Sequence, residues 1–88
     1  MDDNIKHSVK YFILDKFLPG ENPEELTDST PLITGGILDS VATLKLVAFL
    51  EEQFGVTFRP HETDVEHLNT LADIAALVRE KLDERAAR

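Results

Sequence analysis

The chain has 88 residues and no cysteine, so it can form only one modest core and has no disulfides, thiolate metal sites or cysteine nucleophile. Its formal net charge is −8, from 9 basic and 17 acidic side chains. This balance disfavours binding to nucleic acid or anionic membranes and favours basic partner surfaces.

Targeting signals are missing from the sequence. No basic and apolar leader stands at the N-terminus, and no apolar run approaches the length of a membrane span. We therefore expect a cytoplasmic protein without membrane insertion. Residues 1–88 are expected to form one domain, with its core over about 4–84, and to behave as a monomer.

Helical spacing of apolar residues predicts a first helix near the N-terminus. Pro19-Gly20 would end it, because proline and glycine interrupt helices. The buried face would comprise Ile5, Val9, Phe12, Ile13 and Phe17, after Asp2, Asp3 and Asn4 as cap candidates.

A long connection follows between Leu18 and Leu38, rich in proline, glycine, aspartate, glutamate and threonine. Structureless connections of this length are uncommon in small domains unless they pack as functional loops. Residues 22–25 could form a brief turn. The hydrophobic anchors of the connection are Leu26, Leu32, Ile33, Ile37 and Leu38.

The stretch from Gly36 to Gly55 predicts a helix of about four turns. Asp39 is a good N-cap, and Gly55 a good left-handed C-cap. Ser40 would lie at the first turn, where backbone amides lack intrahelical partners and the helix dipole is positive. An anion attached to its hydroxyl would be well placed there.

This helix carries two apolar lines. The first, expected to face the core, contains Leu46, Val47, Leu50 and Phe54. The second begins beside Ser40 and contains Val41, Leu44 and Ala48. If it is exposed, it would form a docking surface. The alternative is that both lines are buried.

After this helix, Val56-Thr57-Phe58 resembles a strand fragment but has no partner strand, so we expect an extended loop with Phe58 packed inward. The pattern of residues 63–66 is that of a capping box beginning at Thr63, which predicts a short helix through about Leu68.

A last helix is predicted to start at Thr70, with Asp73 completing another capping box. Lys81 and Arg85 would complement the dipole at its C-terminal end, and residues 84–88 are expected to fray. The buried face would comprise Leu71, Ile74, Ala75, Val78 and Leu82.

Catalysis by Ser40 itself is poorly supported. A nucleophile elbow needs glycines two residues away on either side, where this chain has Leu38 and Ala42. The three histidines, His7, His61 and His67, stand in no triad context. No metal site is expected either, because His61-Glu62 is followed by Val65 where a zinc motif needs histidine.

The combined residues of the central stretch resemble the signature of the acyl and peptidyl carrier proteins. The shared features are Asp39-Ser40 before an apolar residue, then Leu44, Leu46-Val47, Leu50-Glu51-Glu52 and Phe54-Gly55. The resemblance extends from about Ile5 to Leu82 and implies an all-α four-helix bundle. Three main helices and a short third helix would be arranged with a long loop between helices one and two.

In that family a phosphopantetheinyl transferase, using Mg²⁺, attaches 4'-phosphopantetheine from coenzyme A to the serine. The resemblance implies that Ser40 bears this arm, and that the chain is a non-catalytic shuttle for thioester-bound cargo. An adenylating or acyl ligase and downstream acyl-processing enzymes would be its other partners. The matching partner-binding positions are Asp39, Val41, Leu44, Lys45, Ala48, Glu51 and Glu52. The two glutamates could equally be a solvated face.

Departures from the family pattern bear on the cargo. Ala42 and Lys45 stand where carriers of primary fatty-acid synthesis have acidic residues, so we expect a less acidic recognition face. The Gly-x-Leu-Asp-Ser form of residues 36–40 resembles D-alanyl and free-standing peptidyl carriers. This favours an aminoacyl cargo in a natural-product or cell-envelope pathway. The alternatives are a fatty-acid or polyketide acyl carrier, or a helical interaction module that is never modified.

Overall fold

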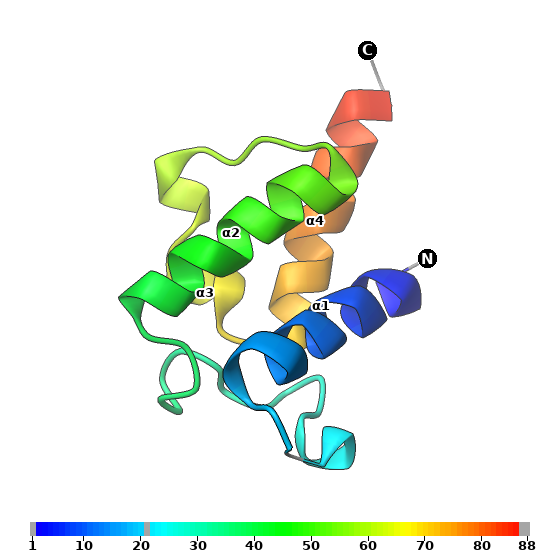
Figure 1. Cartoon of the computed structure of the whole chain (residues 1–88). Coiled ribbons are helices and arrows are strands. Elements are labelled where there is room, and N and C mark those ends of the chain that lie inside the picture. Colours follow the sequence, from blue (N-terminus) through cyan, green and yellow to red (C-terminus); the bar gives the residue numbers. More distant parts are fainter. Residues whose placement is uncertain (1, 21, 87–88) are drawn as a thin grey trace.

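In the computed structural model, residues 2–20 and 22–86 are described, apart from the side chains of Asp2, Asp3 and Pro23. Four α-helices and two short 3₁₀ turns make up this part of the chain, which contains no strand (Figure 1). The elements are α1 (Asp2–Phe17), η1 (Pro23–Glu25), α2 (Ser40–Phe54), η2 (Pro60–Glu62), α3 (Val65–Leu68) and α4 (Leu71–Ala86). The predicted all-α bundle, with a short third helix, is confirmed.

The four helices enclose one apolar core. Helix α1 packs against α4, α3 packs against the same helix, and α2 crosses the bundle (Figure 1). The most deeply buried side chains come from all four helices and from the long connection: Val9, Ile13, Leu32, Leu46, Leu50, Leu68, Ile74 and Val78. No helix in the described residues is long and apolar enough to cross a membrane.

The apolar face predicted for helix α1 is only partly buried. Ile5, Val9 and Ile13 are buried, whereas Phe12 and Phe17 are half-buried. Phe12 instead stacks on Phe49 of α2, with ring centroids 4.1 Å apart. Leu14, which the prediction omitted, is buried. Of the three cap candidates, Asn4 lies inside α1, and the side chains of Asp2 and Asp3 are outside the described residues.

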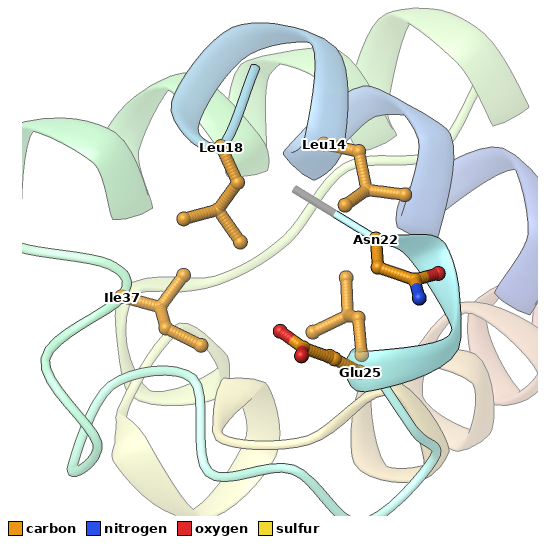
Figure 2. A pocket seen from close by; sticks show the side chains of 6 residues that line it. Leu14, Leu18, Asn22, Glu25 and Ile37 are labelled. Atoms are coloured by element: carbon orange, nitrogen blue, oxygen red, sulfur yellow. The ribbon is translucent and has the colours of Figure 1, made fainter. Parts of the chain in front are cut away.

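The long connection packs as a structured loop, as expected. Leu26, Leu32 and Leu38 are buried, Ile33 and Ile37 are half-buried, and residues 23–25 form the brief turn. Figure 2 shows a small apolar pocket that this loop leaves beside the end of α1. It is lined by Leu14, Leu18, Asn22, Glu25, Leu26 and Ile37, and Ser40 is not among the lining residues.

Two local predictions for the C-terminal half need correction. Asp64, and not Thr63, is the N-cap of α3, because its side chain accepts the His67 amide at 3.2 Å. The Thr63 hydroxyl instead donates to the Pro60 carbonyl. Residues 84–86 were predicted to fray but belong to α4, which ends at Ala86. Residues 87–88 lie outside the described part.

The reason for the longer α4 is tertiary. Arg85 reaches across to the C-terminal end of α2, where its guanidinium donates to the carbonyls of Phe54 and Gly55 at 3.4 and 3.1 Å. Lys81 pairs with Glu62 of η2 at 2.7 Å. Both cations therefore bind other elements, and only Arg85 lies in the last turn of α4, where it also complements the helix dipole. The predicted Thr70 cap is confirmed, since its hydroxyl accepts the Asp73 amide at 3.0 Å.

Candidate functional site

Ser40 is the first residue of α2, and Asp39 is its N-cap, as predicted. The Asp39 carboxylate accepts the Ala42 amide at 2.7 Å, and its backbone carbonyl accepts the Thr43 amide at 2.9 Å. The cap residue has extended backbone angles, which turn the chain into the helix. Ser40 itself is exposed, so its hydroxyl is placed at the positive end of α2 and open to solvent.

The Ser40 hydroxyl has no hydrogen-bond partner among the described residues. In particular, no histidine is bonded to it. The His67 ring lies 2.6 Å from the Asp64 carboxylate, and the His7 ring packs on Tyr11. Nor do the described residues hold a group of three or more His, Asp or Glu side chains that could bind a metal ion. Within the described residues, the hydroxyl therefore has neither a general base nor a metal site beside it.

A groove of about 630 Å³ opens beside Ser40, between the start of α2 and the start of α3. Apolar side chains dominate it, with Asp39 and Asp64 as the charged groups. The lining residues are Ile33, Leu38, Asp39, Ser40, Thr43, Leu44, Val47, Thr63, Asp64 and Val65. A flexible chain attached to the Ser40 hydroxyl would start at the rim of this groove.

The second apolar line of α2 is exposed. Val41 and Leu44 have exposed fractions of 60% and 70%, and Ala48 is also exposed. The first line faces the core, with Leu46 and Leu50 fully buried and Val47 and Phe54 half-buried. Of the two alternatives that the sequence left open, the structure shows the exposed one.

The charged candidates on α2 fall into two groups. Lys45 and Glu52 are exposed and line a second hollow, with Ala48, against the rings of Phe12 and Phe49. Glu51 is half-buried, and its carboxylate accepts the Phe58 amide at 2.9 Å. It therefore supports the loop after α2.

The expected effect of Ala42 on the recognition face needs correction. Ala42 is buried, with only 7% of its surface exposed, so it packs toward the core and does not face a partner. Of the two departures seen in the sequence, only Lys45 changes the charge of the exposed face.

Several residues near Ser40 were missed. Val65 is an exposed apolar residue across the groove, and Thr43 lies beside Leu44 in its wall. Asn69, between α3 and α4, bonds to the loop that precedes Ser40. Thr43 could have been found from its place three residues after Ser40, whereas Val65 and Asn69 contact segments more than twenty residues away and left only a weak signal in the sequence.

Comparisons of the sequence with known proteins show which proteins it is similar to. The family model described as "Phosphopantetheine attachment site" matches residues 18–78. The chain is 45% identical over 53 residues to D-alanyl carrier proteins of Lactococcus lactis subsp. cremoris and subsp. lactis, which is 60% of this chain and 67% of those proteins. It is 31% identical over 78 residues to an acyl carrier protein of Chlamydia muridarum, which is 89% of this chain and 96% of that protein.

Proposed function

Because the chain belongs to the phosphopantetheine-binding carrier proteins, which carry a covalent 4'-phosphopantetheine and leave catalysis to partner enzymes, we propose that Ser40 bears this group. The observation that carries the proposal is the exposed, unbonded hydroxyl at the start of α2, on the rim of the groove. Residues 1–88 act as one carrier domain in this proposal.

The residues around Ser40 support the attachment in distinct ways. Asp39 caps α2 and so fixes Ser40 as the first residue of the helix. The positive end of the helix dipole favours the phosphodiester formed when the Ser40 oxygen bonds to phosphorus, loses its proton and displaces the nucleotide part of coenzyme A. The bound group supplies a thiol that holds cargo as a thioester.

The partner surface follows from what is exposed around this serine. We propose that the transferase, a ligase and downstream acyl-processing enzymes dock on the exposed face of α2. Val41, Leu44 and Ala48 would supply apolar contacts, flanked by the charged residues Asp39, Lys45 and Glu52. Glu51 would contribute at most its outer edge, since its carboxylate bonds to the Phe58 amide.

An aminoacyl cargo is favoured over a fatty or polyketide acyl chain. Support comes from the Gly-x-Leu-Asp-Ser form of residues 36–40, and from the higher identity to the D-alanyl carrier proteins than to the acyl carrier protein. An adenylating ligase would load the cargo, in a natural-product or cell-envelope pathway. We place these steps in the cytoplasm, where coenzyme A is available to the transferase.

The attachment is tested by intact-protein mass. Purified protein is incubated with coenzyme A, Mg²⁺ and a promiscuous phosphopantetheinyl transferase. We expect the wild type to gain one phosphopantetheinyl group, as should the control variant Ser29→Ala, whose exposed serine lies in the connection. Ser40→Ala should gain none. An unmodified but folded wild type, with two different transferases, would instead support the interaction module that is never modified.

The cargo class needs a second assay on the modified protein. The holo form is offered D-alanine with ATP and a D-alanine adenylating ligase, and in parallel a fatty acid with ATP and an acyl ligase. Loading with D-alanine alone would support the aminoacyl assignment, whereas loading with the fatty acid alone would reverse it.

A further inference from the structure

Asn69 is half-buried in the two-residue link between α3 and α4, and it binds three consecutive residues of the long connection. Its backbone carbonyl accepts the Leu32 amide at 2.6 Å. Its side-chain oxygen accepts the amides of Ile33 and Thr34, both at 3.0 Å. We call these bonds, together with the 3.2 Å bond from the Asn69 amide nitrogen to the Thr34 hydroxyl, the Asn69 clasp.

The orientation of the Asn69 side chain follows from its partners. Two backbone N–H groups can be satisfied only by an acceptor, so the amide oxygen must face Ile33 and Thr34. The amide nitrogen then points to the Thr34 hydroxyl, which can accept from it. Every hydrogen bond of the Asn69 side-chain oxygen goes to residues 33 and 34 of the loop.

The clasp is continuous with the start of α2. The Leu32 carbonyl accepts the Leu38 amide at 2.8 Å, and the Ile33 carbonyl accepts the Gly36 amide at 3.1 Å. Residues 32–38 therefore form a closed loop whose two ends are bonded to each other. Asp39 and Ser40 follow directly after this closure, so the position of the loop fixes the position of the serine.

Few other contacts hold the middle of this loop. Thr34, Gly35 and Gly36 are exposed, and Gly36 has a φ of 83°, in the region that favours glycine. Leu32 and Leu38 anchor its ends in the core. Without the Asn69 oxygen, two amides would lose their partners, and states in which the loop leaves the bundle would gain population.

We propose that Asn69 is a positioning residue for Ser40, acting through the loop of residues 32–38; this rests on the proposed attachment at Ser40. If a transferase binds only the closed loop, its apparent affinity for the carrier is proportional to the fraction of molecules in the closed state. Once bound, the serine reacts as before. Loss of the clasp should therefore raise KM for the carrier protein and leave kcat unchanged.

The experiment compares Asn69→Ala with Asn69→Asp in transferase kinetics, with the carrier as the varied substrate. Asn69→Ala removes the acceptor of two backbone amides and should raise KM several-fold, reaching roughly tenfold when the open loop becomes the major state, with kcat within about twofold. Asn69→Asp retains an acceptor for both amides and should restore KM. Thr34→Ala removes the two bonds between the Thr34 hydroxyl and the Asn69 side chain but keeps the backbone amide bonds, and should raise KM about twofold.

Asn22→Ala is the matched control. Asn22 also uses its side-chain oxygen to accept a backbone amide in the same connection, that of Glu24 at 3.0 Å, but it is not bonded to the loop of residues 32–38. Its KM should equal that of wild type. Amide hydrogen exchange at Ile33 and Thr34 should be faster than in wild type for Asn69→Ala, and unchanged for Asn22→Ala.

The outcomes separate this inference from the attachment itself. Wild-type kinetics in both Asn69→Ala and Thr34→Ala would overturn the positioning role, as would an equal KM rise in Asn22→Ala. Should Asn69→Ala fail to fold, the Thr34→Ala result decides alone. Failure of wild type to gain the group would instead overturn the assignment of Ser40.

Discussion

Individual hydrogen bonds decide which polar side chains around α2 remain available to a partner. Asp39 and Glu51 both have a carboxylate oxygen bonded to a backbone amide, of Ala42 and of Phe58 respectively. The Ser40 hydroxyl has no such bond within the described residues. The serine hydroxyl is thus unbonded, while Asp39 and Glu51 maintain the backbone at the two ends of α2.

Glu51 and its neighbour Glu52 form a natural pair for a stability test. Glu51→Ala should lower the free energy of unfolding by about 1 kcal/mol, because the half-buried Phe58 amide loses a charged acceptor. Glu51→Gln retains an acceptor and should lose less. Glu52 is exposed, so Glu52→Ala should change stability by less than about 0.5 kcal/mol.

Urea denaturation of the three variants measures these differences. Equal losses in Glu51→Ala and Glu52→Ala would show that the bond to Phe58 contributes nothing to stability, and would return Glu51 to the partner surface.

Helix α2 has two apolar faces that differ in exposure. Leu46 and Leu50 are fully buried and hold α2 on the bundle, whereas Val41 and Leu44 are largely exposed next to Ser40. Exposed apolar side chains contribute little to folding and lower solubility. Their presence next to Ser40 is therefore consistent with the proposed docking of partner proteins. The two faces can therefore be separated by substitution.

Leu44→Ala and Leu46→Ala make this separation testable. Leu46→Ala should lower the free energy of unfolding by about 2–5 kcal/mol, because it leaves a cavity in the core. Leu44→Ala should change it by less than about 0.5 kcal/mol, yet reduce the transferase kcat/KM roughly tenfold.

Denaturation and transferase kinetics on the same samples provide the comparison. A Leu44→Ala variant that is modified as fast as wild type would remove Leu44 from the proposed docking surface.

Ion pairs join the elements at the C-terminal half of the molecule. Lys81 of α4 bonds to Glu62 of η2, and this hydrogen bond lowers the pKa of Glu62 below its ordinary 4.5. The bond between Asp64 and His67 lowers the pKa of Asp64 below 3.8 and raises the pKa of His67 above 6.5. These shifts make folding stability depend on pH.

The signs define a window of maximal stability. A lowered carboxylate pKa adds stability that is complete above the ordinary value and is lost as pH falls through the folded value. A raised histidine pKa adds stability that is complete below 6.5 and is lost as pH rises through the folded value. The combined contribution should therefore be largest between about pH 5 and 6.5.

Urea denaturation from pH 3 to 8 should show this maximum. His67→Gln should reduce the loss of unfolding free energy above pH 6.5. Lys81→Met should reduce the loss of unfolding free energy below about pH 5, because Glu62 then lacks the bond that lowers its pKa. Two variants with the wild-type pH profile would show that neither pair couples to folding.

Much of the fold could be predicted because its signals are local. Apolar spacing of three and four residues marks one face of each helix, and the caps at Asp39, Gly55 and Thr70 bond within four residues of themselves. Ser40 could be located for the same reason, since its motif and its helix start are one continuous stretch.

Other features were decided only by the tertiary structure. Which apolar line of α2 faces outward, the burial of Ala42, the bonds from Arg85 to the end of α2 and the Asn69 clasp all depend on how separate elements pack. Asn69 and Ile33 are 36 residues apart, and no periodicity connects them. The sequence by itself determined the helices and the serine; packing determined which surface surrounds that serine, because contacts between distant segments exist only once the core has formed.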